Sequence, residues 1–143
     1  MIAVVVVGIL SAMAYPAMTS LLQKSRRADA IKALTTIVQE QERYRSNRGS
    51  YADALGAGDT GLGFTSSQLS KISTHYSLSL AGVGNPPSFV SGYKLTATAA
   101  SSQQAGDADC VTISVKLEGA MLSYLSTKKD GTDTSSPPLC WTR

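Results

Sequence analysis

The chain opens with MIAVVVVGILSAMAYPAMTSLL, from Met1 to Leu22, and this stretch decides the kind of protein that follows. It carries no charged side chain, and no later stretch of the chain is comparably apolar. A helix needs about 20 mostly apolar residues to cross the hydrocarbon core of a bilayer, and this segment just reaches that length. Gly8 and Pro16 would be unfavourable in a soluble helix but are tolerated in membrane helices, and we expect them to kink this one.

Two other interpretations of the opening segment were weighed. A buried core helix is disfavoured, because a chain of 143 residues is too small to surround a helix that is apolar on all sides. A cleaved signal peptide stays open, since Ala12-Met13-Ala14 fits the small-x-small cleavage pattern and Ile2–Leu10 could form its apolar region. The absence of a basic residue before that region disfavours cleavage.

Charge and cysteine content give conflicting signals about orientation. The segment from Lys24 to Arg48 holds seven cations and three anions, which by the positive-inside rule would place the rest of the chain in the cytoplasm. Cys110 and Cys140 indicate the opposite if they form a disulfide, which needs an oxidising compartment. The alternative is two unrelated buried thiols. The basic segment suits anionic headgroups or acidic partner groups, whereas nucleic-acid binding is allowed by charge but supported by no recognised motif.

After Leu22 the pattern becomes amphipathic and continues to about Arg48, with Gly49 as the expected stop. No earlier stop signal separates it from the apolar segment, so we predict one helix of about 48 residues. Its apolar stripe consists of Ala30, Ala33, Leu34, Ile37, Gln41 and Tyr44, widened by Ile31 and Val38. Its polar side consists of Asp29, Lys32, Thr36, Glu40 and Arg43.

The remainder of the chain predicts a small sheet. Ser50 to Ser70 is glycine-rich and is expected to be an irregular loop, to which Ser66–Lys71 could add a short turn. Strand-like alternation follows at 76–80, 93–98, 111–117 and 121–125, and residues 99–109 are expected to form a polar loop. Consecutive strands with short links favour an antiparallel meander, and the amphipathic helix has the right stripe to cover one of its faces.

We find no catalytic, cofactor-binding or metal-binding constellation, so the sequence predicts a protein that is not an enzyme. His75 has no second histidine to pair with, and Asp107 and Asp109 in the polar loop are interpreted as solvated. Asp130-Gly-Thr-Asp133 resembles a fragment of a calcium loop but lacks the EF-hand pattern, so a turn is the better interpretation.

Several motifs along the chain form a pattern when they are taken together. They are Met1-Ile-Ala-Val-Val-Val-Val-Gly-Ile-Leu10 with Ala14-Tyr-Pro16, Ser25-Arg-Arg-Ala-Asp-Ala30, Gln41-Glu-Arg-Tyr44 with Gly49-Ser-Tyr51, Cys110, and Cys140-Trp141. This pattern resembles the type IV pilins, and among them the PilE-like minor pilins of Gram-negative bacteria. The resemblance spans the chain, is strong over residues 1–51 and is loose between the cysteines.

This resemblance implies an α+β pilin fold. A long N-terminal helix, apolar in its first half and amphipathic in its second, packs on a four-stranded antiparallel sheet, and a C-terminal loop is bounded by a Cys110–Cys140 disulfide. Residues 1–22 would be the transmembrane and filament-core half of the helix, and 23–143 the globular domain. That domain divides into a helix half at 23–48, a loop at 49–75, a sheet at 76–125 and a C-terminal loop at 126–143. The membrane and filament-core residues would be Ile2, Val4, Val5, Val6, Val7, Ile9 and Leu10.

The implied function is a structural subunit of a type IV pilus, involved in pilus assembly and thereby in twitching motility, adhesion or DNA uptake. The Cys140-Trp141 ending favours a minor pilin. Its partners would be other pilin subunits, inner-membrane lipid before assembly, and the pilus assembly machinery. It would sit in the inner membrane with a periplasmic C-terminal domain and later in the extracellular pilus. The alternatives are a pseudopilin of type II secretion and a periplasmic domain behind a cleaved signal peptide.

The resemblance also predicts that the chain lacks its natural start. Family members have a basic leader, a cleavage point and a mature start similar to F-T-L-I-E, and this sequence begins just where that motif ends. We therefore expect Met1 to be an internal methionine. The glutamate that guides docking onto the filament in the family cannot be assigned to any residue here.

Overall fold

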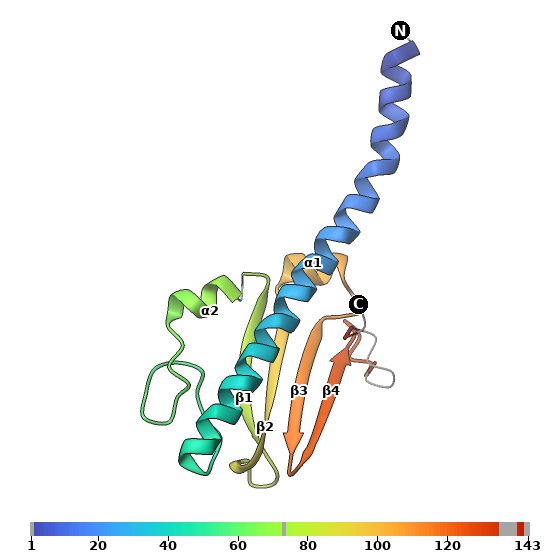
Figure 1. Cartoon of the computed structure of the whole chain (residues 1–143). Helices are drawn as coiled ribbons and strands as arrows, with labels where there is room; N and C mark the ends of the chain where they lie inside the picture. Colours follow the sequence, from blue (N-terminus) through green and yellow to red (C-terminus); the bar gives the residue numbers. More distant parts are fainter. Residues whose placement is uncertain (1, 73, 135–139, 142–143) are drawn as a thin grey trace.

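The computed structural model describes the backbone of residues 2–72, 74–134 and 140–141, and the side chains of 18–71, 74–134 and 140–141. A helix of 47 residues, α1 (Ile2–Arg48), is followed by a four-stranded antiparallel sheet. Figure 1 shows the first half of α1 projecting away from the sheet and the second half lying across it. The predicted α+β architecture is confirmed.

The second half of α1 follows the predicted amphipathic stripe. Ala30, Leu34 and Ile37 are fully buried, whereas Lys32 and Thr36 on the other side of the helix are exposed. Burying such a stripe against a sheet is what stabilises a helix in a small domain, because helix propensity alone contributes little.

The helix ends where the sequence predicts. Gly49 has φ of 75° and donates its backbone N–H to the Arg45 carbonyl at 2.8 Å. This left-handed conformation carries no Cβ penalty in glycine and terminates the helix. Arg45 and Arg48 in the last turn favour the negative end of the helix dipole.

The apolar N-terminal segment is described only as backbone up to Ala17. Backbone helix runs through Gly8 and Pro16, and the kink that we expect there stays a prediction. The predicted membrane and filament-core side chains lie outside the described residues; they are Ile2, Val4, Val5, Val6, Val7, Ile9 and Leu10. Within the part of the chain whose side chains are described, no helix is long and apolar enough to cross a membrane.

The sheet has the order β1-β2-β3-β4, and every neighbouring pair is antiparallel. The strands are β1 (Tyr76–Val83), β2 (Ser88–Ala99), β3 (Thr112–Glu118) and β4 (Met121–Thr127). β2 begins five residues before the alternating segment that predicted it. A bulge at Gly82/Val83 lets Val83 pair with Ser88, so backbone pairing extends the strand where the side-chain pattern does not alternate.

The core lies between α1 and one face of the sheet. Tyr93, Leu95 and Ala97 on β2, with Ile113 and Val115 on β3, are buried on this face. Alternate residues of a strand point to opposite faces, so the residues between them, rich in serine and threonine, form the outer face.

The loop after α1 is fastened to the helix by a buried amide. Gln41 donates its side-chain N–H to the Ala52 carbonyl at 3.1 Å and accepts the Ala52 N–H at 2.9 Å. Next to this clamp, the ring of Tyr51 packs edge-on against Tyr93 with centroids 4.9 Å apart. These contacts satisfy a buried glutamine and tie residues 51–52 to the core.

Two short helices interrupt the loops. α2 (Ser66–Ile72) is a helix where the sequence indicated only a short turn within an irregular loop. α3 (Ser101–Gly106) lies where we expected an irregular polar loop, and that expectation was wrong. Its six residues show no apolar periodicity. Buried Gln103 anchors it by donating its side-chain N–H to the Gln23 carbonyl of α1 at 3.2 Å, so tertiary contact rather than local pattern places this helix.

Candidate functional site

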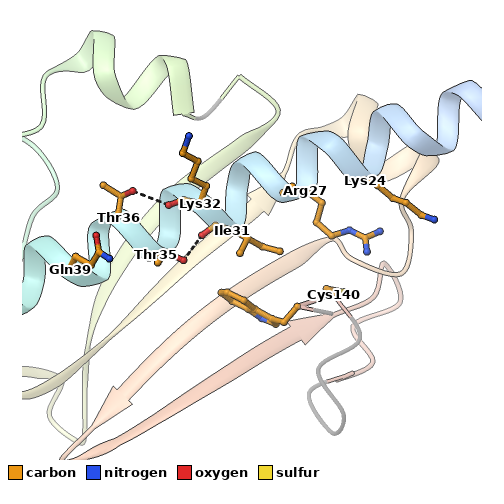
Figure 2. Close-up of a pocket in the computed structure, with 10 residues that line it drawn as sticks. Lys24, Arg27, Ile31, Lys32, Thr35, Thr36, Gln39 and Cys140 are labelled. Atoms are coloured by element: carbon orange, nitrogen blue, oxygen red, sulfur yellow. Dashed lines mark hydrogen bonds between the residues drawn. The ribbon is translucent and has the colours of Figure 1, made fainter. Parts of the chain in front are cut away.

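A groove runs between α1 and the C-terminal residues Cys140 and Trp141 (Figure 2). It arises because α1 packs on β2 and β3 while the sheet extends further, so the β4 side is left uncovered by the helix (Figure 1). The groove has a volume of about 710 Å³. Its lining residues are Lys24, Arg27, Ala28, Ile31, Lys32, Thr35, Thr36, Gln39, Cys140 and Trp141.

The groove is cationic. Lys24, Arg27 and Lys32 line it, and no carboxylate lines it in the part of the chain that the structure describes. Figure 2 shows Lys24 and Arg27 on the side of α1 that faces Cys140, whereas Lys32 points away from Cys140 at the opposite rim. Lys24 and Lys32 are exposed. Spacing along one helix therefore sets out positive charges along the length of the groove.

The helix floor of the groove is otherwise short and uncharged. Thr35 donates its hydroxyl to the Ile31 carbonyl at 2.8 Å, and Thr36 donates to the Lys32 carbonyl at 3.0 Å. These bonds use the hydroxyl protons but leave acceptor lone pairs. Ile31 contributes an apolar patch between the cations. The floor can therefore accept an anionic chain that also has apolar parts.

A disulfide holds in place the residues that line the groove opposite α1, Cys140 and Trp141. Cys110 and Cys140 are bonded, with Cα atoms 5.7 Å apart, and both side chains are buried. The predicted Cys110–Cys140 disulfide is thus confirmed. The bond fastens residue 140 beside the start of β3 and so brings Trp141 opposite α1. Trp141 donates its indole N–H to the Leu125 carbonyl at 3.1 Å, and its ring lies 4.8 Å from that of Tyr124.

A buried ion pair fixes one end of the groove. Arg27 contacts both carboxylate oxygens of Asp107 through bonds of 3.0, 2.7 and 2.8 Å. The Asp107 side chain is only 7% exposed, so the expectation of a solvated Asp107 was wrong. A carboxylate in the 99–109 segment can be buried because an arginine from α1 pairs with it. Beside the pair, burial and the negative charge of Asp107 raise the pKa of the Tyr76 hydroxyl.

The other polar residues considered from the sequence do not converge on a site. Asp109 is exposed, as expected, and pairs with Lys128 at 3.0 Å. Asp130 forms a turn by accepting the Thr132 N–H at 2.9 Å, and this hydrogen bonding lowers the pKa of its carboxyl. Among the described residues, no three histidine, cysteine or acidic side chains are placed to hold a metal ion.

A comparison with protein-family models identifies one match, over residues 16–114. That model describes the type IV minor pilin ComP, the DNA uptake sequence receptor. The chain belongs to the ComP family of type IV minor pilins. The match covers well over half of the chain, and it includes the α1 side of the groove but not its Cys140–Trp141 wall.

Solved structures agree on the fold of this ComP-family pilin. The structure of a type IV pilin from Shewanella oneidensis is similar, with a TM-score of 0.50 and 21% identity. The similarity covers 85% of this chain and 99% of that one. Among curated proteins no match is found.

Family and fold together establish the general role. The ComP-family pilin is a structural subunit of a type IV pilus, and membership implies association with a pilus, with the membrane and with other pilin subunits. The family and the fold are those of structural pilins rather than enzymes.

Sequence reasoning missed the position of Trp141 in the groove and the ion pair that holds Arg27. Asp107 had no local signal, because its partner Arg27 lies 80 residues away in the sequence. Trp141 was noted only as part of a family-like ending, although a lone tryptophan beside a cysteine could have indicated a fixed aromatic. Lys24 and Lys32 were assigned to a basic helix without a partner surface.

Proposed function

We propose that this ComP-family pilin takes part in DNA uptake and that DNA binds along the groove beside α1. Two findings support this proposal. The matching family model describes a DNA uptake sequence receptor, and the matched residues include the α1 cations of the groove. The observation that carries the proposal is a groove lined by Lys24, Arg27 and Lys32, with no carboxylate among the described residues that line it.

The chemistry of the groove suits a phosphate backbone. Cations that neutralise phosphates release condensed counterions, so they contribute affinity that falls as salt rises. Lys24 and Lys32 supply this charge directly because they are exposed. Arg27 contributes less, since Asp107 already neutralises much of its charge. We therefore assign the principal phosphate contacts to the two lysines.

Fluorescence anisotropy with a labelled duplex oligonucleotide tests the assignment. The double variant Lys24→Gln/Lys32→Gln should bind more weakly than wild type, and its slope of log affinity against log salt should fall by up to about 2 units. The matched control is Lys71→Gln/Lys94→Gln, which removes the same charge from exposed lysines on α2 and β2, outside the groove lining. The control should retain most of the slope.

Two results would count against the proposal. If the control lost as much affinity and slope as the groove variant, binding would follow net charge, and the groove would not be the site. If the wild-type chain bound no duplex even at low salt, DNA uptake through this subunit would itself be refuted.

We further propose that the N-terminal half of α1 occupies two environments in succession. Residues 1–22 would span the inner membrane once, with domain 23–143 in the periplasm, until the assembly machinery moves the subunit into the pilus. The apolar side chains from Ile2 to Leu10 would then pack against other pilin helices. A segment that is apolar on every side can exchange lipid for helices with little loss of burial, and Gly8 and Pro16 would let it bend during that exchange.

A further inference from the structure

Cys140 and Trp141 are the residues of the described chain that line the groove opposite α1. Both lie outside the family match, which ends at residue 114. Trp141 is the only tryptophan of the chain. It is partly buried and lies against Tyr124, which is 45% exposed. Trp141, supported by the ring of Tyr124, thus faces a cationic helix across the groove.

The contacts of Trp141 limit what it can do for a ligand. Its indole N–H is its single hydrogen-bond donor, and that donor is already used by the Leu125 carbonyl at 3.1 Å. What remains accessible is ring surface. Ring surface can contact the sugars of a duplex and the base faces of unpaired or terminal nucleotides irrespective of sequence, because every base has a π-face. Trp141 is therefore suited to add affinity for DNA without reading base edges.

The position of Trp141 depends on the disulfide. Cys140 is buried against the start of β3 by its bond to Cys110, and its sulfur lies 3.5 Å from the Asp109 carbonyl. The Leu125 hydrogen bond orients the indole but is a single bond between neutral groups, which contributes only modestly to stability. Without the disulfide, the ordering of residues 140–141 would rest on that bond and on the Tyr124 contact. The covalent bond is thus the main restraint on this wall.

We propose that Trp141 is a DNA-contacting residue of the groove and that the Cys110–Cys140 disulfide acts as its positioning device, so that DNA capture needs the oxidised protein. The proposal rests on DNA binding in the groove, as proposed above. Reduction by a dithiol reagent transfers two electrons and two protons to the disulfide and yields two thiols, while the reagent becomes a cyclic disulfide. The reduced chain keeps its cations but loses the fixed aromatic wall.

The test measures two quantities for each variant of the full-length chain, its affinity for DNA and the dependence of that affinity on salt. Trp141→Leu should weaken binding of a labelled single-stranded oligonucleotide by about fivefold or more, the lower end of what aromatic stacking contributes, and binding of a labelled duplex by less, because the bases of a duplex are already stacked on each other. Trp141→Phe, which keeps a ring, should recover part of that loss. Cys110→Ser/Cys140→Ser, and wild type reduced with dithiothreitol, should resemble Trp141→Leu. The salt slope should stay at the wild-type value throughout, because no cation is removed.

A second readout reports the wall directly. Because the chain has one tryptophan, unlabelled duplex DNA should change the intrinsic fluorescence of oxidised wild type, and the change should be smaller after reduction. Far-UV circular dichroism checks that each variant is folded, and Trp141→Leu keeps the test decisive if the cysteine variant does not fold.

The outcomes separate this inference from the proposed function. Wild-type affinity in a folded Trp141→Leu chain would overturn the contact, and wild-type affinity in a folded cysteine variant would overturn the positioning role. Either result, with binding that still depends on Lys24 and Lys32, would leave the DNA-binding function intact. A wild-type chain that binds no DNA would refute the proposed function first.

Discussion

The buried ion pair between α1 and the segment after α3 offers a direct test of what holds the helix on the domain. Asp107→Ala removes both oxygens that receive the three Arg27 bonds of 3.0, 2.7 and 2.8 Å. The guanidinium would then have no carboxylate beside it, in a site where its side chain is only 19% exposed. The substitution therefore leaves a poorly hydrated charge rather than merely deleting a contact.

The expected cost follows from that burial. Removing one partner of a fully buried pair costs about 3–5 kcal/mol. Arg27 is partly exposed and can recover some hydration, so we expect the free energy of unfolding to fall by about 2–3 kcal/mol. For a chain of this size, the melting midpoint should fall by roughly 5–10 °C. The matched control is Glu118→Ala, which breaks the Lys116–Glu118 pair of 2.7 Å, where the side chains are 37% and 54% exposed. That change should cost about 0.5 kcal/mol or less.

The measurement is urea unfolding of the full-length chain in mild detergent, followed by circular dichroism at a helical wavelength and by Trp141 fluorescence. The double variant Arg27→Met/Asp107→Leu should recover most of the lost stability, because it removes both charges together. An Asp107→Ala chain within about 0.5 kcal/mol of wild type would refute the reasoning. It would mean that Arg27 finds water or another partner at no cost.

Three further predictions test the apolar segment, the disulfide and the core. Val5→Asp should abolish incorporation into pili, because an unpaired charge in lipid or in a dry filament core is costly, and normal amounts of the variant in purified pili would contradict this. Cys140→Ser should lower the free energy of unfolding by about 3.5 kcal/mol, since the bond closes a loop with a sequence separation of 30, and an unchanged melting midpoint would argue against it. Tyr93→Phe should stabilise the protein by up to about 1 kcal/mol, because the buried Tyr93 hydroxyl has no hydrogen-bond partner among the described residues. Burial raises the pKa of the Tyr93 hydroxyl above its unfolded value of 10.0, so the folded state favours the protonated form. The stability that depends on this protonation is fully present below the unfolded pKa and is lost as pH rises through the folded pKa. Alkaline unfolding should therefore be less steep in Tyr93→Phe.

Local patterns predict a large part of this fold. A hydrophobic stripe of period 3.6 from Ala30 to Tyr44 locates the buried side of α1, and Gly49 marks its end, because both depend on residues within a few positions of each other. Period-two alternation locates the four strands for the same reason. The disulfide is harder to predict, because the pairing of cysteines cannot be deduced from their spacing in the sequence alone. The resemblance to pilins supplied it, and the structure confirms it.

The candidate site divides along the same line. The sequence by itself determined that α1 is basic from Lys24 onward and that Cys140 and Trp141 lie next to each other near the C-terminus. Only the tertiary structure decided that the basic side of α1 faces Cys140 and Trp141, that Arg27 forms an ion pair with Asp107, and that α3 forms in a polar loop. Each of these facts depends on contacts between groups that are about 80 residues or more apart in the sequence. No local periodicity carries that information. The opening stretch from Met1 to Leu22 is the opposite case. Its preference for an apolar environment follows from its composition alone, whatever it packs against.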